Sequence, residues 1–183
     1  MASSPFCLVE DAIPHLIKNL QERQMKIIIL TASPVGRIDQ IPSIEDWRDI
    51  ELKRLGIDIS DSFSNHSPTV FNLLNRERGL YPLFKNGILL TNGDSNTKGN
   101  VLKAFLNLLD WKPSKIIFVD DRMTYLNSVE ATLSDLGIHH LGIHYKGSDH
   151  VPVTHLSEET IKSAWQEIVD KTKLVARKEA SEF

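Results

Sequence analysis

Cysteine, long apolar runs and an excess of charge of either sign are all scarce in this 183-residue sequence. The single cysteine, Cys7, cannot form a disulfide within the chain, and no group of Cys and His residues has the spacing of zinc ligands. Because no base can be paired with Cys7 from the sequence, the thiol is expected to be inert. No stretch approaches the roughly 20 apolar residues that span a bilayer, so no transmembrane helix is expected.

Charge is balanced along the chain. The 24 acidic and 21 basic residues are interspersed and give a formal net charge of −3. No basic patch is predicted, which argues against nucleic acid and anionic membranes as partners. Residues 1–6 have neither a positive start nor a long apolar run, so no secretory signal is recognised in this chain. The cytoplasm is the default expectation, and a signal peptide upstream stays an open alternative.

The composition of the chain, with 41% hydrophobic and 25% charged residues, fits one globular domain. Strand-like apolar runs alternate with amphipathic stretches, which indicates an α/β fold with a mainly parallel sheet. A short helical pattern at 70–75 lies within an irregular section. Strands are expected at 25–30, 87–90, 115–119 and 138–145, and helices at 13–20, 44–55, 98–109, 125–136 and 157–176.

Three polar groups follow predicted strands or open a helix, where an open parallel sheet binds its ligands. Thr31 follows the first strand, Lys98 opens a helix after a turn rich in Asn and Gly, and the pair Asp120 and Asp121 ends a very apolar strand. A hydroxyl, a cation and a carboxylate pair are what phosphoryl transfer requires around a nucleophile. Each also has a plain structural interpretation: a turn threonine, a solvated lysine, and a turn in which Asp121 caps the next helix.

The order of these groups resembles the haloacid-dehalogenase-like (HAD) superfamily, in an uncharacterised bacterial branch. The stretch "IIILTAS" resembles its second motif, "TNGDSNTKGNVL" its third, and "KIIFVDDRMTYLNSVE" its fourth. The resemblance covers residues 8–145. It implies a Rossmannoid α/β fold with helices on both faces of a mainly parallel sheet, and a phosphatase-type hydrolase activity on a small phosphorylated molecule.

The resemblance also implies roles for individual residues. Thr31, with the backbone at Ala32 and Ser33, would bind the phosphoryl group, and Lys98 would pair with the phosphate and the nucleophile. Asp121 would be the first Mg²⁺ ligand and Asp120 the second. Residues 1–176 would form a single domain in which 37–90 is a cap or insertion-like region, and 177–183 would be a flexible tail. Arg37, in that region, is a candidate for binding substrate charge and equally a solvated loop residue.

Two departures from the HAD pattern stand out. Tyr125 occupies a position where a carboxylate or amide often follows the second aspartate, and Asn127 comes two residues later. No Asp-x-Asp sequence occurs in the chain, so the motif that supplies the nucleophile and the general acid is absent. In the family this motif follows the central first strand, between the strands that here end at Thr31 and Asp120. The domain is therefore expected to be incomplete, as a truncated or split reading frame would leave it.

These patterns favour a Mg²⁺-dependent HAD-like phosphohydrolase fragment that is inactive alone for want of its nucleophile. A missing amino-terminal segment would then be its partner. The alternative is a non-catalytic phosphate-binding or protein-interaction module built on the same residues. A receiver-like signalling domain also uses an acidic pair, a threonine and a lysine, but the order of those groups along such a chain differs from the order here.

Overall fold

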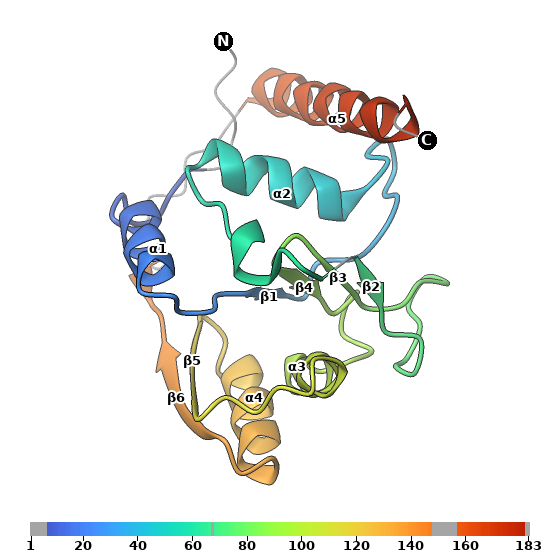
Figure 1. The fold of residues 1–183 in the computed structure, drawn as a ribbon. Helices are drawn as coiled ribbons and strands as arrows, with labels where there is room; N and C mark the ends of the chain where they lie inside the picture. Colours follow the sequence, from blue (N-terminus) through green and yellow to red (C-terminus); the bar gives the residue numbers. More distant parts are fainter. Residues whose placement is uncertain (1–6, 67, 148–156, 182–183) are drawn as a thin grey trace.

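The computed structural model describes residues 7–66, 68–147 and 157–181, which form an α/β fold (Figure 1). Helices lie on both sides of a four-stranded sheet, and one helix packs on a second, two-stranded sheet. The elements, in chain order, are α1 (Ile13–Glu22), β1 (Ile29–Thr31), α2 (Ile44–Arg54), the 3-10 helix η1 (Ser60–Phe63), β2 (Thr69–Val70), β3 (Leu83–Lys85), β4 (Ile88–Leu90), α3 (Lys98–Leu108), β5 (Lys115–Asp120), α4 (Met123–Asp135), β6 (His139–His144) and α5 (Glu158–Ser181).

The first sheet has four strands in the order β1-β4-β3-β2. β1 and β4 are parallel, with Ile29 opposite Ile88, whereas β3 pairs antiparallel with both β4 and β2. Asn86 and Gly87 close the β3–β4 hairpin with φ of 50° and 80°. Two consecutive residues with positive φ are typical of the tight hairpin turn for which Asn-Gly is the preferred pair. The expectation of a mainly parallel sheet was therefore wrong for this part of the chain.

The second sheet consists of β5 and β6, which are parallel and joined by α4. Residues 115–120 pair in register with 139–144. Among the described residues, neither β5 nor β1 has a strand on its other side. The α/β fold is therefore divided into two sheets, with β1 and β5 each at an unpaired edge.

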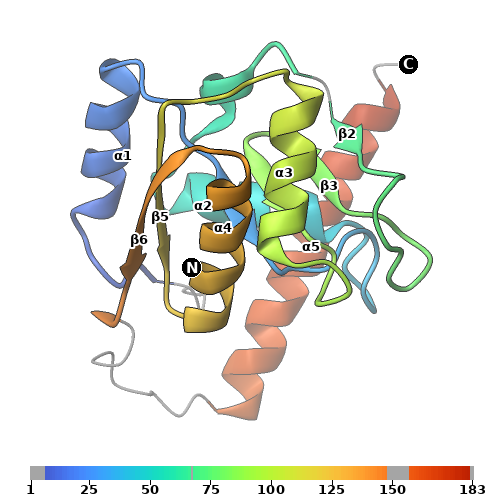
Figure 2. The same cartoon turned by 90° about the horizontal axis from the view of Figure 1, so that it is seen from below.

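The two sheets share one helical layer. Ile28 and Leu30, in and beside β1, pack against the same apolar cluster as Ile116 and Phe118 of β5. That cluster lies on α3 and α4, which pack against each other; in Figure 1, α3 lies below the four-stranded sheet and α4 lies beside β5 and β6, and Figure 2 shows the two helices side by side. Its buried members are Leu102, Leu106, Val129, Leu133 and Ile138. β1 and β5 thus lie over the same pair of helices although they do not pair.

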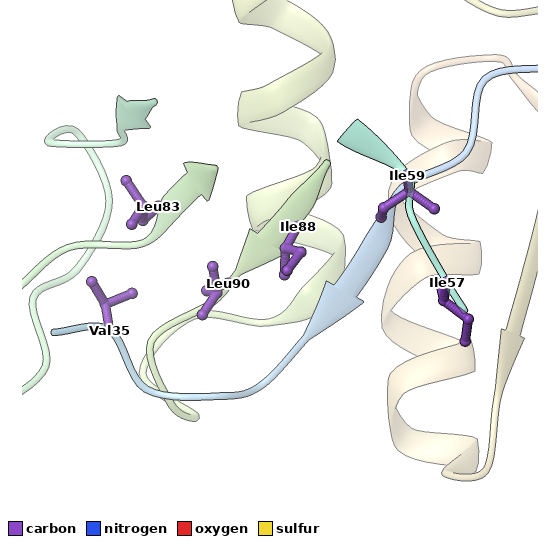
Figure 3. Close-up of a cluster of buried hydrophobic side chains, with 6 residues drawn as sticks. All are labelled: Val35, Ile57, Ile59, Leu83, Ile88 and Leu90. Atoms are coloured by element: carbon purple, nitrogen blue, oxygen red, sulfur yellow. The ribbon is translucent and has the colours of Figure 1, made fainter. Parts of the chain in front are cut away.

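The opposite face of the four-stranded sheet has its own core, drawn in Figure 3. Partly buried Ile29 of β1, Leu52 of α2 and Ile13 and Ile17 of α1 pack against it. α2 also contacts α5, through a cluster that includes Trp47 and Val169. The buried members of the core in Figure 3 are Val35, Ile57, Ile59, Leu83, Ile88 and Leu90.

Local signals account for most helix boundaries. The Ser43 hydroxyl caps α2 by accepting a hydrogen bond from the Asp46 amide, and the Thr97 hydroxyl caps α3 in the same way from Asn100. Gly56 and Gly137, with φ of 79° and 64°, follow the ends of α2 and α4. Glycine is favoured there because a Cβ strains this backbone conformation. The predicted ends of these helices are confirmed to within about two residues.

Several expected elements differ in the structure. The pattern at 70–75 is not a helix: β2 covers Thr69–Val70, and turns follow. The first strand begins at Ile29 and not at residue 25, since only this part has a partner in β4. The range 37–90, expected to be cap-like, contributes β2, β3 and β4 to the sheet of β1. The tail expected from residue 177 is helical as far as Ser181.

Candidate functional site

The segments that follow β1 and β4 are tied together at the carboxyl ends of these strands. The Thr91 amide donates to the Thr31 carbonyl at 2.9 Å, and the Gly93 amide donates to the Ala32 carbonyl at 3.2 Å. Asn92, fully buried with φ of 58°, accepts from the Val35 amide at 2.9 Å. The segment after β4 leads directly into α3. The end of β1 and the start of α3 are therefore held at the same edge of the sheet.

Two hydroxyls, those of Thr31 and Ser33, lie at the end of β1 and just beyond it. The Thr31 hydroxyl accepts a hydrogen bond from the Ser33 amide at 3.2 Å and donates to the Ser33 hydroxyl at 3.3 Å. Ser33 is buried, with 7% of its surface exposed. Since its oxygen already accepts a hydrogen bond, its own proton is available to donate.

Arg48 of α2 reaches the Ser33 hydroxyl. Its Nε donates to the Ser33 hydroxyl at 3.1 Å, and its guanidinium lies 4.7 Å from the centre of the Trp47 ring. Arg48 and Thr31 both line a cavity of about 130 Å³ between β1 and α2. Burial lowers the pKa of Arg48, because removing a guanidinium from water disfavours its charged form. Sequence patterns did not point to Arg48 as a site residue, since an arginine in an amphipathic helix is ordinarily solvated.

Lys98 and Asp120 form a buried ion pair. Lys98 Nζ donates to Asp120 Oδ2 at 2.6 Å, and the side chains are only 8% and 6% exposed. Asp120 Oδ1 accepts from the Arg122 amide at 2.9 Å. The ammonium also lies 4.4 Å from the centre of the Tyr125 ring, within the range of a cation–π contact. Tyr125 thus packs on the lysine, at the position where the HAD pattern often has a carboxylate or amide.

Gly99 lets α3 approach α4 closely beside this ion pair. A Cβ at Gly99 would overlap the main-chain oxygen of Ser128 and the hydroxyl of Thr132. The first turn of α3, which carries Lys98, is therefore held against the helix that follows Asp120.

Asp121 and Arg37 lie outside these contacts. The Asp121 side chain is exposed, and its main-chain oxygen is 3.0 Å from His144 Nε2. Arg37 is exposed too and donates to the main-chain oxygen of Asp39 in its own loop. In the described part of the chain, no three His, Cys, Asp or Glu residues are grouped as metal ligands would be.

The residues predicted for the site therefore fall into two connected groups. One comprises Thr31, Ala32 and Ser33 with Arg48, and the other comprises Lys98 with Asp120. They are linked through the segment that runs from Thr91 to the start of α3. Together they define an α/β protein with hydroxyl, cationic and carboxylate groups at one edge of a divided sheet.

Comparison with known proteins gives the family. The sequence profile of the family described as "Protein of unknown function (DUF2608)" matches residues 2–180, so the chain belongs to that family. An uncharacterized protein of Rickettsia typhi is 30% identical over 169 residues, which are 92% of this chain and 53% of the relative. Another, of Rickettsia felis, is 29% identical over 145 residues, 78% of this chain and 49% of the relative.

This chain spans about half the length of the curated relatives it matches. No solved structure matches it. Neither the family description nor the names of these relatives mentions a phosphohydrolase, so the HAD resemblance stays a prediction. In the residues that the structure describes, every helix is too short or too polar to cross a membrane.

Proposed function

We propose that this chain is the larger part of a HAD-like, Rossmannoid phosphohydrolase domain that acts on small phosphomonoesters and is inactive without a segment supplying its nucleophilic aspartate. The observation that carries the proposal is the gathering of Thr31, Ser33, Lys98 and Asp120 at one edge of an α/β fold. These groups come from three distant parts of the sequence. Their chemistry is that of a phosphate site: hydroxyl donors, a cation and a carboxylate.

The proposed roles follow from the hydrogen bonds. Ser33, whose proton is free, would donate to an oxygen of the transferring phosphoryl group together with the backbone at Ala32, and Thr31 would join them once its hydroxyl turns from Ser33 to the phosphate. Lys98 is fixed at the start of α3 by its bond to Asp120, and would offset the negative charge that develops during transfer. Packing of Tyr125 on the ammonium limits its movement. The lysine would then enter the reaction already oriented, without the entropic cost of ordering a flexible side chain.

The missing strand is proposed to pair between β1 and β5. Each of these strands has an unpaired edge among the described residues, and both pack on the α3–α4 layer. Unpaired strand edges present backbone amide and carbonyl groups that a further strand would satisfy. The greater length of the relatives is consistent with such a strand. An Asp-x-Asp sequence directly after this strand would then lie at the same edge of the sheet as Thr31 and Asp120.

The reaction would proceed in two steps. A carboxylate oxygen of the supplied aspartate attacks phosphorus, and the substrate's alkoxide leaves and takes a proton from the second aspartate of the motif. Water, losing its proton to that second aspartate, then attacks phosphorus. The attack releases inorganic phosphate and regenerates the first carboxylate.

Magnesium belongs to the proposal, but Asp120 and Asp121 alone do not complete a site for it. Both oxygens of Asp120 are engaged, one by Lys98 and the other by the Arg122 amide. Asp121 is exposed and offers a single carboxylate. Mg²⁺ is commonly bound by one or two carboxylates and several waters, so Asp121 would need a further ligand from the supplied segment.

The test is hydrolysis of an aryl phosphate with and without Mg²⁺. The 183-residue chain is expected to give no turnover above background, because it has no Asp-x-Asp motif. The DNA next to its reading frame should encode a strand followed by that motif. A protein that includes this strand should hydrolyse the ester, and Asp→Asn at the nucleophile should abolish turnover. Absence of the motif from all neighbouring frames, or no turnover by the longer protein, would contradict the phosphohydrolase.

A protein-interaction module is the second candidate, and one observation favours it. Ile117 and Val119 of β5, with Leu141 and Ile143 of β6, are 51%, 52%, 45% and 42% exposed. An apolar patch of this kind on a sheet is typical of a surface that binds another protein segment. The longer protein that includes the supplied strand distinguishes the two candidate functions. If the chain is an interaction module, this protein should hydrolyse no phosphate ester, even though the added segment covers the apolar patch.

A further inference from the structure

Arg48 is the cation beside the Thr31 and Ser33 hydroxyls that lacks an anionic partner. The structure describes no carboxylate within ion-pair distance of its guanidinium; Glu51, which lines the same cavity, pairs with Arg54. Lys98, in contrast, is neutralised by Asp120. In the two groups of site residues, Arg48 is therefore the positive charge that remains uncompensated.

A half-buried guanidinium without a counter-anion is costly. Desolvation lowers the pKa of Arg48, and its protein contacts are one hydrogen bond to a neutral hydroxyl and the face of Trp47. Such contacts offset only part of the cost of removing a charge from water. A guanidinium carries five N–H donors in a rigid fork, and of the three nitrogens of Arg48 only Nε donates to an acceptor among the described residues. The donors at its other two nitrogens are available to a ligand.

Ser33 supplies a further donor beside Arg48. Ser33 Oγ accepts from both Arg48 Nε and the Thr31 hydroxyl, which leaves the Ser33 proton free to donate. The cavity of about 130 Å³ beside the guanidinium is lined by Arg48, Thr31 and Glu51 and otherwise by largely apolar side chains. An uncompensated guanidinium beside a hydroxyl that is free to donate favours an oxyanion.

We infer that Arg48, with the hydroxyl of Ser33, forms an oxyanion subsite that binds the phosphate group of the substrate through the guanidinium. The assignment of the oxyanion as phosphate rests on the proposed function; the subsite itself rests on the geometry around Arg48. Arg48 would hold the phosphate from the α2 side, and Lys98 would approach it from α3.

Binding of inorganic phosphate to the 183-residue chain tests the inference, measured by isothermal titration calorimetry or ³¹P NMR. Arg48→Met should weaken binding about tenfold or more, the loss expected for a charge-assisted hydrogen bond. Arg37→Met is the matched control, since it removes the same charge from an exposed loop. It should change the dissociation constant by less than about twofold, because the charge of an exposed residue is screened. Equal effects of the two variants, or no phosphate binding by the wild type, would overturn the inference.

Further variants keep the test decisive. Circular dichroism and the thermal midpoint report whether Arg48→Met folds; if it does not, Arg48→Lys keeps the charge and removes the planar fork, and should still weaken binding. The double variant Lys98→Gln, Asp120→Asn tests the proposed function separately, because it replaces the buried ion pair by neutral amides. Loss of binding in the double variant but not in either Arg48 variant would refute the subsite alone. Loss in the Arg48 variants but not in the double variant would refute the phosphate role of Lys98 alone.

Discussion

The ion pair of Lys98 and Asp120 should contribute strongly to stability because both side chains are buried. Lys98→Met leaves an uncompensated carboxylate, for which a loss of about 3–5 kcal/mol in the free energy of unfolding is expected. Adding Asp120→Asn should restore most of it, since an amide can still accept the Arg122 hydrogen bond. Urea denaturation measures the free energy of unfolding of the single and the double variant. The exposed pair Lys53–Asp49 is the control, and Lys53→Met should cost at most about 1 kcal/mol.

Glu77 should make stability depend on pH. The side-chain hydrogen bond from Ser95, aided by the Ser95 amide, lowers the pKa of Glu77 below its ordinary value. A carboxyl with a lowered folded-state pKa contributes stability above its unfolded pKa, near 4.3, and loses that contribution as pH falls through the folded value. Ser95→Ala should therefore lower the thermal midpoint at pH 7 and have a smaller effect in the acid range. Ser134→Ala, at an exposed site in α4, should show no such trend; a Ser95→Ala effect independent of pH would contradict the assignment.

At the scale of single residues, the sequence predicts candidate site residues that end a strand or begin a helix. It does not predict Arg48, which reaches Ser33 from the middle of a helix. Thr31, Lys98 and Asp120 were identified because each stands at the end of an apolar strand or the start of a helix. Arg48 is separated from Ser33 by fifteen residues and meets it only after α2 has packed over β1. Sequence alone could not show either that Asp120 is engaged by Lys98 or that Asp121 is exposed, since burial depends on packing.

Among the helices, the contact between α3 and α4 should tolerate little added side-chain volume at the point where the two helices come closest. Gly99→Ala should lower the free energy of unfolding by about 1–3 kcal/mol, because its Cβ would overlap the Ser128 main chain. This loss should exceed the gain that alanine normally brings in a helix. Gly142→Ala is the control, since a Cβ there would meet only Leu126 at an ordinary 3.5 Å. Chemical denaturation compares the two, and a Gly99→Ala variant as stable as Gly142→Ala would disprove the close approach.

Helices were predicted more accurately than strands because their signals are local. The Ser43 and Thr97 caps and the glycines after α2 and α4 can be read directly from the sequence. The hairpin of β3 and β4 also has a local signal, Asn86-Gly87, which the sequence interpretation did not use. In contrast, the pairing of β1 with β4 and the separation of β1 from β5 depend on contacts between distant segments. No local pattern determines such contacts.

At the scale of the whole molecule, the apolar patch on β5 and β6 should make the isolated chain self-associate. The patch combines exposed side chains, including Ile117 and Val119, with the free edge of β5. Ile117→Lys should reduce association in sedimentation velocity and lower the binding of a hydrophobic dye. Leu73→Lys is the control, because Leu73 is 96% exposed and is not one of the patch residues. A wild-type chain that stays monomeric at all concentrations, or equal effects of the two variants, would show that the patch does not drive association.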